Sequence, residues 1–317
     1  AEVPGPVFGK VVAKLKNTAQ ILYIIYLTMF VIFAVILWLC GMPIFDSIIT
    51  AMGGAGTGGF AVYNDSIAHY HSDLITYVVT VGTLLFGVNF NLYFYILLRK
   101  IKFFFQDEEL RTYFAIVAIS TGLIILNIFG IYHNLADSFK YSFFEVSTII
   151  TTTGFGLTDI TKWQLFSQYI LLLLMFIGGS AGSTAGGIKV IRAMIIAKIA
   201  LNQTLASLYP NRILSLHING SVLDKETQHS VLKNLAVYVL IILSLVTVLS
   251  LDNQDLLIVT SAAASTFNNI GPLLGTTDSF AIFSPLSKLI MGFAMIAGRL
   301  EIYPLLLLFL PKTWPKT

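Results

Sequence analysis

Three short turns rich in glycine and threonine carry the residues best suited to bind a bare cation. They read Gly56-Thr57-Gly58-Gly59-Phe60, Thr151-Thr152-Thr153-Gly154-Phe155-Gly156 and Phe267-Asn268-Asn269-Ile270-Gly271-Pro272. Glycine accepts a positive φ and adds no side chain, so the main-chain carbonyls of such turns can converge and replace the water shell of a dehydrated cation. The chemistry that these turns indicate is cation coordination by backbone oxygen.

Each turn follows a short helical stretch, over Pro43 to Met52, Ser138 to Ile150 and Gln254 to Ser265. These stretches are too short to cross a bilayer, which takes about 20 mostly apolar residues. Each would direct its C-terminal end, with its partial negative charge, toward a cation in mid-membrane. The alternative is that the glycines only let helices pack closely. Three turns at the same place in a repeat favour a pore.

A longer glycine-rich stretch, from Gly178 to Gly187, interrupts an apolar segment over 164–206. Continuous helix is unfavourable there, because each glycine costs about 0.8–1 kcal/mol relative to alanine. A phosphate-binding loop is excluded as an interpretation, since Ile188 rather than lysine follows Gly187 and no strand precedes the stretch. The sequence predicts a non-helical loop inside the membrane.

Arg299 is a cation within a predicted span. Fourteen residues separate Gln164 from Gly178 and also Pro285 from Arg299, and about 1.5 Å per residue places both near 21 Å, roughly the same depth. A charge at that depth is costly unless paired or hydrated, so Arg299 is expected to face the pore. There the loop carbonyls and the hydroxyls of Ser180, Ser183 and Thr184 would accept its hydrogen bonds. Alternatively, Arg299 pairs with Glu301 or extends to the interface.

The amino-acid composition indicates that most of the surface around these elements does not face water. Of the 317 residues 56% are hydrophobic and only 11% are charged, with a mean hydropathy of +0.83, whereas a soluble domain carries about 25% charged residues. The net charge of +3 is too small to suggest a nucleic-acid partner. A single cysteine, Cys40, excludes an intrachain disulfide and a cysteine metal cluster. No catalytic arrangement of side chains is recognisable, so we expect neither an enzyme nor an organic cofactor.

The apolar segments repeat in order, as long helix, short helix with turn, and long helix. Spans are predicted over 20–40, 74–98, 113–132, 231–251 and 286–309, besides the interrupted 164–206. Most lysines and arginines fall on one side, which the positive-inside rule places in the cytoplasm. The expected units are a lead-in 1–19, a pore unit 20–98, a cytoplasmic connector 99–112, a pore unit 113–206 containing the loop 178–187, a second connector 207–230, a pore unit 231–309 and a tail 310–317.

The expected fold class is therefore an all-α polytopic membrane protein, in which repeated helix–pore helix–filter loop–helix units surround a central ion pore. Discontinuous helices also occur in ion-coupled secondary transporters. All three units here have the same orientation, which suits a ring around a pore better than inverted repeats. A scaffold or interaction module that does not conduct is a third reading.

Thr-Thr-Gly-Phe-Gly at 152–156, Asn-Asn-Ile-Gly-Pro at 268–272, the loop at 178–187 and Ala-Gly-Arg-Leu-Glu at 297–301 resemble the Trk/Ktr/HKT superfamily, most closely its bacterial TrkH membrane subunits. The resemblance implies potassium uptake through a glycine-lined selectivity filter in the bacterial cytoplasmic membrane, without an organic cofactor. By motif position the potassium-binding glycines would be Gly58, Gly154 and Gly271. The other implied filter residues are Thr57, Thr153, Asn269 and Ile270.

The resemblance also implies a gate, in which the intramembrane loop and Arg299 close the path beneath the filter. It implies a homodimer in membrane lipid, resting on a cytosolic ring of nucleotide-binding regulatory subunits of the TrkA type. The family has four repeats, so the first is expected to precede residue 1 and the chain to be a fragment that does not conduct selectively alone. The loop residues expected to form the gate are Gly178, Gly179, Ser180, Gly182, Ser183, Thr184, Gly186 and Gly187.

Overall fold

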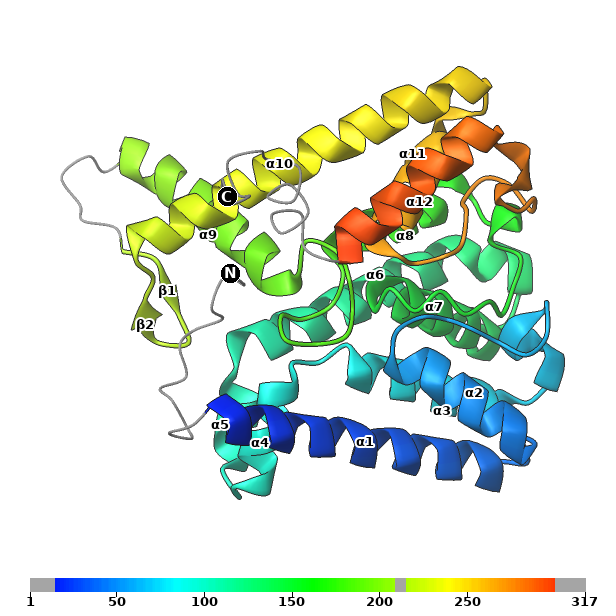
Figure 1. The fold of residues 1–317 in the computed structure, drawn as a ribbon, viewed down its shortest axis with the longest axis horizontal. Coiled ribbons are helices and arrows are strands. Elements are labelled where there is room, and N and C mark those ends of the chain that lie inside the picture. Colours follow the sequence, from blue (N-terminus) through cyan, green and yellow to red (C-terminus); the bar gives the residue numbers. More distant parts are fainter. Residues whose placement is uncertain (1–14, 209–214, 300–317) are drawn as a thin grey trace, which may run out of the picture.

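The structure is a computed structural model that describes residues 15–208 and 215–299, with side chains from residue 19 onward. Predicted features at 1–14, 209–214 and 300–317 lie outside the described residues. They include most of the lead-in, part of the second connector, the end of the last unit, Glu301 and the tail. The described residues are mostly helical, with almost no strand (Figure 1).

Long apolar helices form the frame. They are α1 (Leu15–Leu39), α6 (Glu108–Tyr132), α9 (Val190–Leu208) and α10 (Lys225–Leu249). Within the described residues these four helices are long and apolar enough to cross a membrane, and apolar length of this kind is the main mark of a spanning helix. The helices predicted over 20–40, 113–132 and 231–251 are confirmed.

Three shorter helices lie between longer ones, where short helices followed by turns were predicted. They are α2 (Ile44–Ala55), α7 (Leu135–Ile150) and α11 (Leu256–Asn268). Each packs against the helix before it and the helix after it: α2 against α1 and α3, α7 against α6 and α8, and α11 against α10 and α12. Contacts of α3 with α7 and of α8 with α11 join the three groups side by side (Figure 1).

The span predicted over 74–98 is not one continuous helix. Two helices, α3 (Asp73–Phe86) and α4 (Phe90–Leu97), meet there at an angle of 92°. Asn89 starts the second helix, because its side chain accepts a hydrogen bond from the Asn91 N–H at 3.0 Å. The unbroken apolar character of this stretch hides the bend from a hydropathy argument.

The predicted break within 164–206 is confirmed. α8 (Leu165–Ile177) ends at Gly178, whose φ of +73 is outside helical geometry, and α9 begins at Val190. The last helix, α12 (Pro285–Arg299), covers the described part of the span predicted over 286–309.

Small elements fill the connections. α5 (Ile101–Gln106) lies in the first connector. A hairpin of β1 (His217–Ile218) and β2 (Ser221–Val222) lies in the second and was not predicted. Its Asn219 and Gly220 both have positive φ, as a two-residue hairpin turn requires. The 3-10 turns are η1 (Ser66–Tyr70), η2 (Ile160–Lys162), η3 (Ser250–Asp252) and η4 (Phe280–Ile282).

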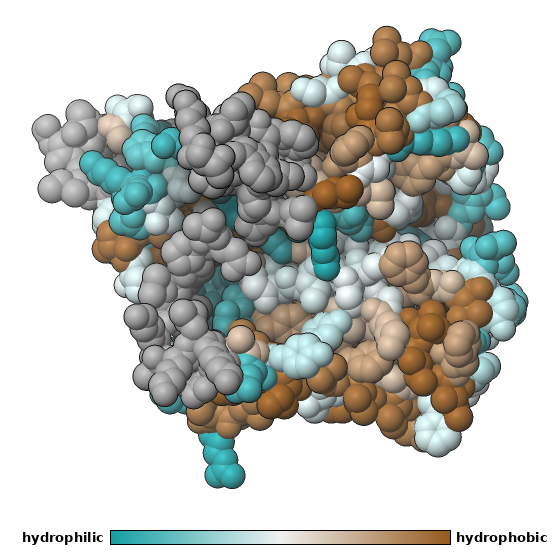
Figure 2. Space-filling view, viewed as in Figure 1, coloured by the Kyte–Doolittle hydropathy of each residue, from teal (hydrophilic) through white to brown (hydrophobic). Residues whose placement is uncertain are grey.

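Large apolar side chains are exposed along the outer helices, while hydroxyls are buried inside. Leu126 on α6 is 79% exposed, whereas Ser147 and Thr151 are fully buried. Figure 2 shows apolar residues gathered along α1 and along α10 to α12 at opposite edges, with paler, more polar residues between them. An apolar exterior around a polar interior is the arrangement of a membrane protein with an internal hydrated path.

Candidate ion pathway

The three turns share one backbone pattern, residue for residue. Thr57, Thr152 and Asn269 each have a left-handed conformation, with φ of 48°, 54° and 56°. Each donates its N–H to the carbonyl three residues earlier, at 3.2, 3.0 and 3.3 Å. Left-handed conformations are unusual for threonine and cost about 1–2 kcal/mol per residue. Their recurrence at one position of every turn indicates that the turn geometry is required there.

This pattern corrects the expected equivalence of the filter glycines. Two residues after each left-handed position stands a glycine with positive φ, namely Gly59 (64°), Gly154 (78°) or Gly271 (113°). The residue equivalent to Gly154 and Gly271 is therefore Gly59, not Gly58. Gly58 corresponds to Thr153 and Ile270, the residues that precede those glycines. The motif reading was one residue early because Gly58 and Gly59 are adjacent and sequence alone does not separate them.

The glycines and the neighbouring carbonyls lie against one another. A Cβ placed on Gly59 would be 2.0 Å from the carbonyl oxygen of Thr153, and a Cβ on Gly154 would be 1.8 Å from that of Ile270. The second and third turns thus present the carbonyl that precedes their own glycine, that of Thr153 or Ile270, to the glycine of the turn before them. Among the described residues no atom lies within 4 Å of a Cβ on Gly271. These contacts join the three turns in a row through the carbonyls of Thr153 and Ile270.

Buried hydroxyls hold the turns in shape. The Thr151 and Thr153 hydroxyls are 2.8 Å apart, and the Ser265 hydroxyl accepts the Gly271 N–H at 2.9 Å. No group of three or more acidic, histidine or cysteine side chains among the described residues is placed to hold a metal ion. The ligands that the turns offer are main-chain carbonyls and hydroxyls, which suit a hard, weakly bound monovalent cation.

The predicted loop lies against two of the turns. The Thr57 hydroxyl donates to the Thr184 carbonyl at 2.8 Å, and the Gly186 N–H donates to the Thr152 hydroxyl at 2.7 Å. Thr57 and Thr152 occupy equivalent positions, so the loop bridges the same point of two turns. A Cβ on Gly186 would lie 2.5 Å from the carbonyl oxygen of Asn268. This close approach to the third turn explains why glycine stands there.

The bend between α3 and α4, which sequence reasoning missed, receives the other side of the loop. The Ser180 N–H donates to the Gly87 carbonyl at 3.0 Å, and the Phe90 N–H donates to the Gly182 carbonyl at 3.1 Å. Breaking the helix frees these groups from their intrahelical partners. The bend and the loop therefore satisfy each other's backbone, as irregular structure inside a membrane must.

Arg299 contacts the loop at one point. Its Nη1 donates to the Thr184 carbonyl at 3.2 Å, the same oxygen that accepts the Thr57 hydroxyl. The hydroxyls of Ser180 and Ser183, which were also expected to accept from Arg299, do not. The Ser183 hydroxyl donates to the Ser180 carbonyl at 2.6 Å, while the buried Ser180 hydroxyl has no partner among the described residues.

Comparisons with known proteins identify the family of the chain. The family described as TrkH, cation transport protein, matches residues 7–316. The Trk system potassium uptake protein TrkH of Salmonella typhimurium is 34% identical over 99% of this chain and 66% of its own length. TrkH and TrkG of Escherichia coli K12 are each 33% identical, with the same coverage. The chain thus spans about two thirds, 66%, of the length of these curated relatives.

A solved structure is also similar. The crystal structure of the potassium transporter TrkH from Vibrio parahaemolyticus matches with a TM-score of 0.90 and 30% sequence identity. The match covers 99% of this chain and 68% of that chain.

Proposed function

This chain belongs to the TrkH family of cation transport proteins, and we propose that it supplies three filter loops of a pore through which potassium enters the bacterial cell. It is a multi-pass protein of the bacterial inner membrane. Its relatives bear the names of potassium uptake proteins. The observation that carries the proposal is the row of carbonyls of Thr153 and Ile270 packed against Gly59 and Gly154.

The proposed filter uses main-chain oxygen from equivalent points of the three turns. The glycines at its centre are Gly59, Gly154 and Gly271, each without a side chain to narrow the path. Gly58, Thr153 and Ile270 supply the preceding carbonyls, and Thr57, Thr152 and Asn269 shape the turn beneath. Potassium is the cargo, and no organic cofactor has a role. The row needs a further loop beyond Gly271, which the described residues do not supply.

We propose the loop 178–187 and Arg299 as the gate beneath this filter. Thr184 joins the loop to both Thr57 and Arg299 through a single carbonyl oxygen. A fixed guanidinium charge close to the path repels a cation, and about 4 kcal/mol acts between unit charges 4 Å apart at an effective dielectric constant of 20. Conduction then requires the loop and Arg299 to move aside together.

The proposal extends to the membrane topology of the chain and to its assembly with other subunits. The pore units are 20–98, 113–206 and 231–309, and the connectors 99–112 and 207–230 with the lead-in 1–19 and tail 310–317 face the cytoplasm. We propose a homodimer in lipid whose cytosolic side contacts a nucleotide-binding regulatory ring of the TrkA type. Uptake coupled to sodium or protons is the second candidate function, since the broken helices at 87–89 and 178–189 suit a coupled transporter as well.

The test is rubidium and potassium uptake into vesicles that contain the complete gene product, with sodium as competitor. We expect uptake driven by membrane potential alone, competed far better by potassium than by sodium, and reduced by at least about tenfold in Gly154→Ala. Gly122→Ala is the matched control, because no atom lies within 4 Å of a Cβ at Gly122. Uptake no greater than in empty vesicles would contradict the proposal. Uptake that requires a sodium or proton gradient would favour the coupled transporter.

A further inference from the structure

Three consecutive acids, Asp107, Glu108 and Glu109, open helix α6, and the first two contact the hairpin whereas the third contacts the loop. Asp107 caps the helix, with its Oδ1 accepting the Leu110 N–H at 2.8 Å. Glu108 is oriented toward the hairpin and α9, and Glu109 toward the loop. Acidic residues in a first turn are stabilised by the helix dipole, but that general effect explains neither the direction nor the partners of the second and third acid.

Glu109 binds both the loop between α8 and α9 and the start of α9. Its Oε1 accepts the N–H of Ala181, inside the loop, at 2.7 Å, and the N–H of Ile191, in the first turn of α9, at 3.2 Å. The residue is only 4% exposed. Hydrogen bonds to a carboxylate are about twice as strong as those between neutral groups. Of the loop contacts described so far, this is the only one in which the partner is an acidic side chain.

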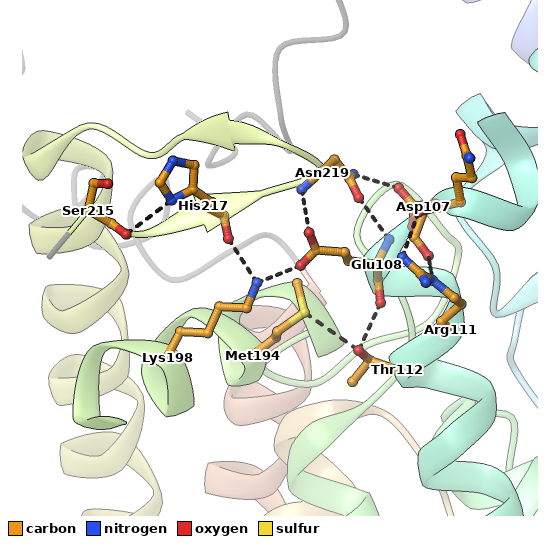
Figure 3. Close-up of polar contacts among 10 residues, drawn as sticks. Asp107, Glu108, Arg111, Thr112, Met194, Lys198, Ser215, His217 and Asn219 are labelled. Carbon is orange, nitrogen blue, oxygen red and sulfur yellow. Dashed lines mark hydrogen bonds and ion pairs between the residues drawn. The ribbon is translucent and has the colours of Figure 1, made fainter. Parts of the chain in front are cut away.

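Glu108 and Asp107 are fastened to the hairpin and to α9 (Figure 3). Glu108 and Asn219 exchange two hydrogen bonds, from the Glu108 N–H to Asn219 Oδ1 at 2.8 Å and from the Asn219 N–H to Glu108 Oε1 at 2.9 Å. Asn219 Nδ2 also donates to Asp107 Oδ2 at 2.8 Å. Lys198 on α9 pairs with Glu108 Oε2 at 2.5 Å and donates to the His217 carbonyl at 2.8 Å.

We propose that Glu109 is a positioning residue that latches the loop in its closed position, and that the hairpin 217–222 holds this latch in place. Because Glu109 follows Glu108 in the same helical turn, a shift of the hairpin moves both residues together. Withdrawal of the Glu109 oxygen then frees Ala181 and the start of α9 in one step. A force applied to the hairpin is thereby transmitted to the loop. The inference rests on the proposed gate.

The experiment compares Glu109→Ala and Glu109→Gln in the complete gene product with Glu226→Ala, an exposed first-turn glutamate of α10, as control. Hydrogen–deuterium exchange of the 178–191 segment reports the loop, and rubidium flux reports the pore. Loss of two hydrogen bonds to a charged acceptor predicts exchange at Ala181 faster by about tenfold or more in Glu109→Ala, with flux raised in parallel. Glu109→Gln keeps one acceptor oxygen without the charge and should restore part of the protection.

Unchanged exchange in Glu109→Ala would overturn the proposal, as would equal effects of Ala and Gln, since the acceptor oxygen that Gln keeps would then hold nothing. Asn219→Ala tests the hairpin with Glu109 intact. It should raise exchange and flux in the same direction by a smaller factor, and no change would remove the hairpin from the mechanism. If the protein that retains Glu109 carries no potassium at all, the proposed function fails, while the exchange measurement still decides whether Glu109 holds the loop.

Discussion

Gly58 and Gly59 are adjacent in the first turn. Substituting each of them separately tests which one occupies the structural position of Gly154 and Gly271. Gly59→Ala introduces a Cβ at a φ of +64°, 2.0 Å from the Thr153 carbonyl oxygen, where real contacts stay above 3.0 Å. The carbonyl must therefore retreat by about 1 Å, and alanine in a left-handed conformation costs about 1–2 kcal/mol besides. A filter carbonyl displaced that far no longer matches a dehydrated ion.

Gly58→Ala is the matched comparison. Gly58 is not among the residues with positive φ, and its added Cβ would meet only ring atoms of Phe60, at 3.0 Å. That ring is 75% exposed and free to rotate away. The main-chain carbonyl of residue 58 stays where it is. The substitution should cost little.

The assay is rubidium uptake by the complete gene product in vesicles, with sodium competition and protein amount measured for both variants. We expect Gly59→Ala to reduce uptake, or the preference over sodium, by at least about tenfold, in line with a distortion of about 1.4 kcal/mol or more. Gly58→Ala should stay within about threefold of the unaltered protein. The reverse order, with Gly58→Ala inactive and Gly59→Ala normal, would refute the structural equivalence of Gly59 with Gly154 and Gly271.

Three further predictions concern the gate and the outer surface. Arg299→Ala should raise rubidium flux, because the substitution removes both the hydrogen bond to the loop and the positive charge near the path. Lys288→Ala, on the same helix, is the control and should leave the flux unchanged. Unchanged or lower flux in Arg299→Ala at normal expression would count against the gate. Thr152→Val removes a neutral hydrogen bond worth about 1 kcal/mol, so basal flux should rise by up to about fivefold, and a decrease would contradict the loop's closing role. The Thr161 hydroxyl, which donates to Asp159 at 2.6 Å, holds the pKa of that half-buried carboxyl below its usual value. Carbon-13 titration of Asp159 should show that its pKa rises in Thr161→Val. The stabilisation that this hydrogen bond gives the folded protein should be present above the usual carboxyl pKa and should be lost as the pH falls through the lowered pKa of Asp159.

Hydropathy and glycine content were sufficient to predict most of the helices and the three turns. Apolar runs of spanning length predicted α1, α6 and α10, and three short stretches ahead of glycine-rich turns predicted α2, α7 and α11. The glycines from 178 to 187 predicted the break between α8 and α9. These predictions succeed because length, apolarity and glycine act locally: a helix in lipid must satisfy its own backbone, and clustered glycines prevent that.

Features set by contacts distant in sequence were missed. The run over 74–98 is apolar on average, and only Gly87 and Asn89, residues typical of helix ends and starts, signalled the 92° bend. Glu109 gave no signal either, because an acid in a first turn is ordinary and its partners lie 72 and 82 residues away. The hairpin was missed since two-residue strands are too short for a periodic pattern.

The sequence by itself determined that this is a helical membrane protein with three equivalent glycine-rich turns and a broken helix. Tertiary structure alone decided which glycine of the first turn matches the others, which carbonyls face them, and what holds the loop. The physical reason is that composition governs whether a segment enters the bilayer, whereas the direction of a carbonyl depends on φ and ψ and on partners supplied by other helices. One residue of register, from Gly58 to Gly59, changes which atoms line the path without altering composition.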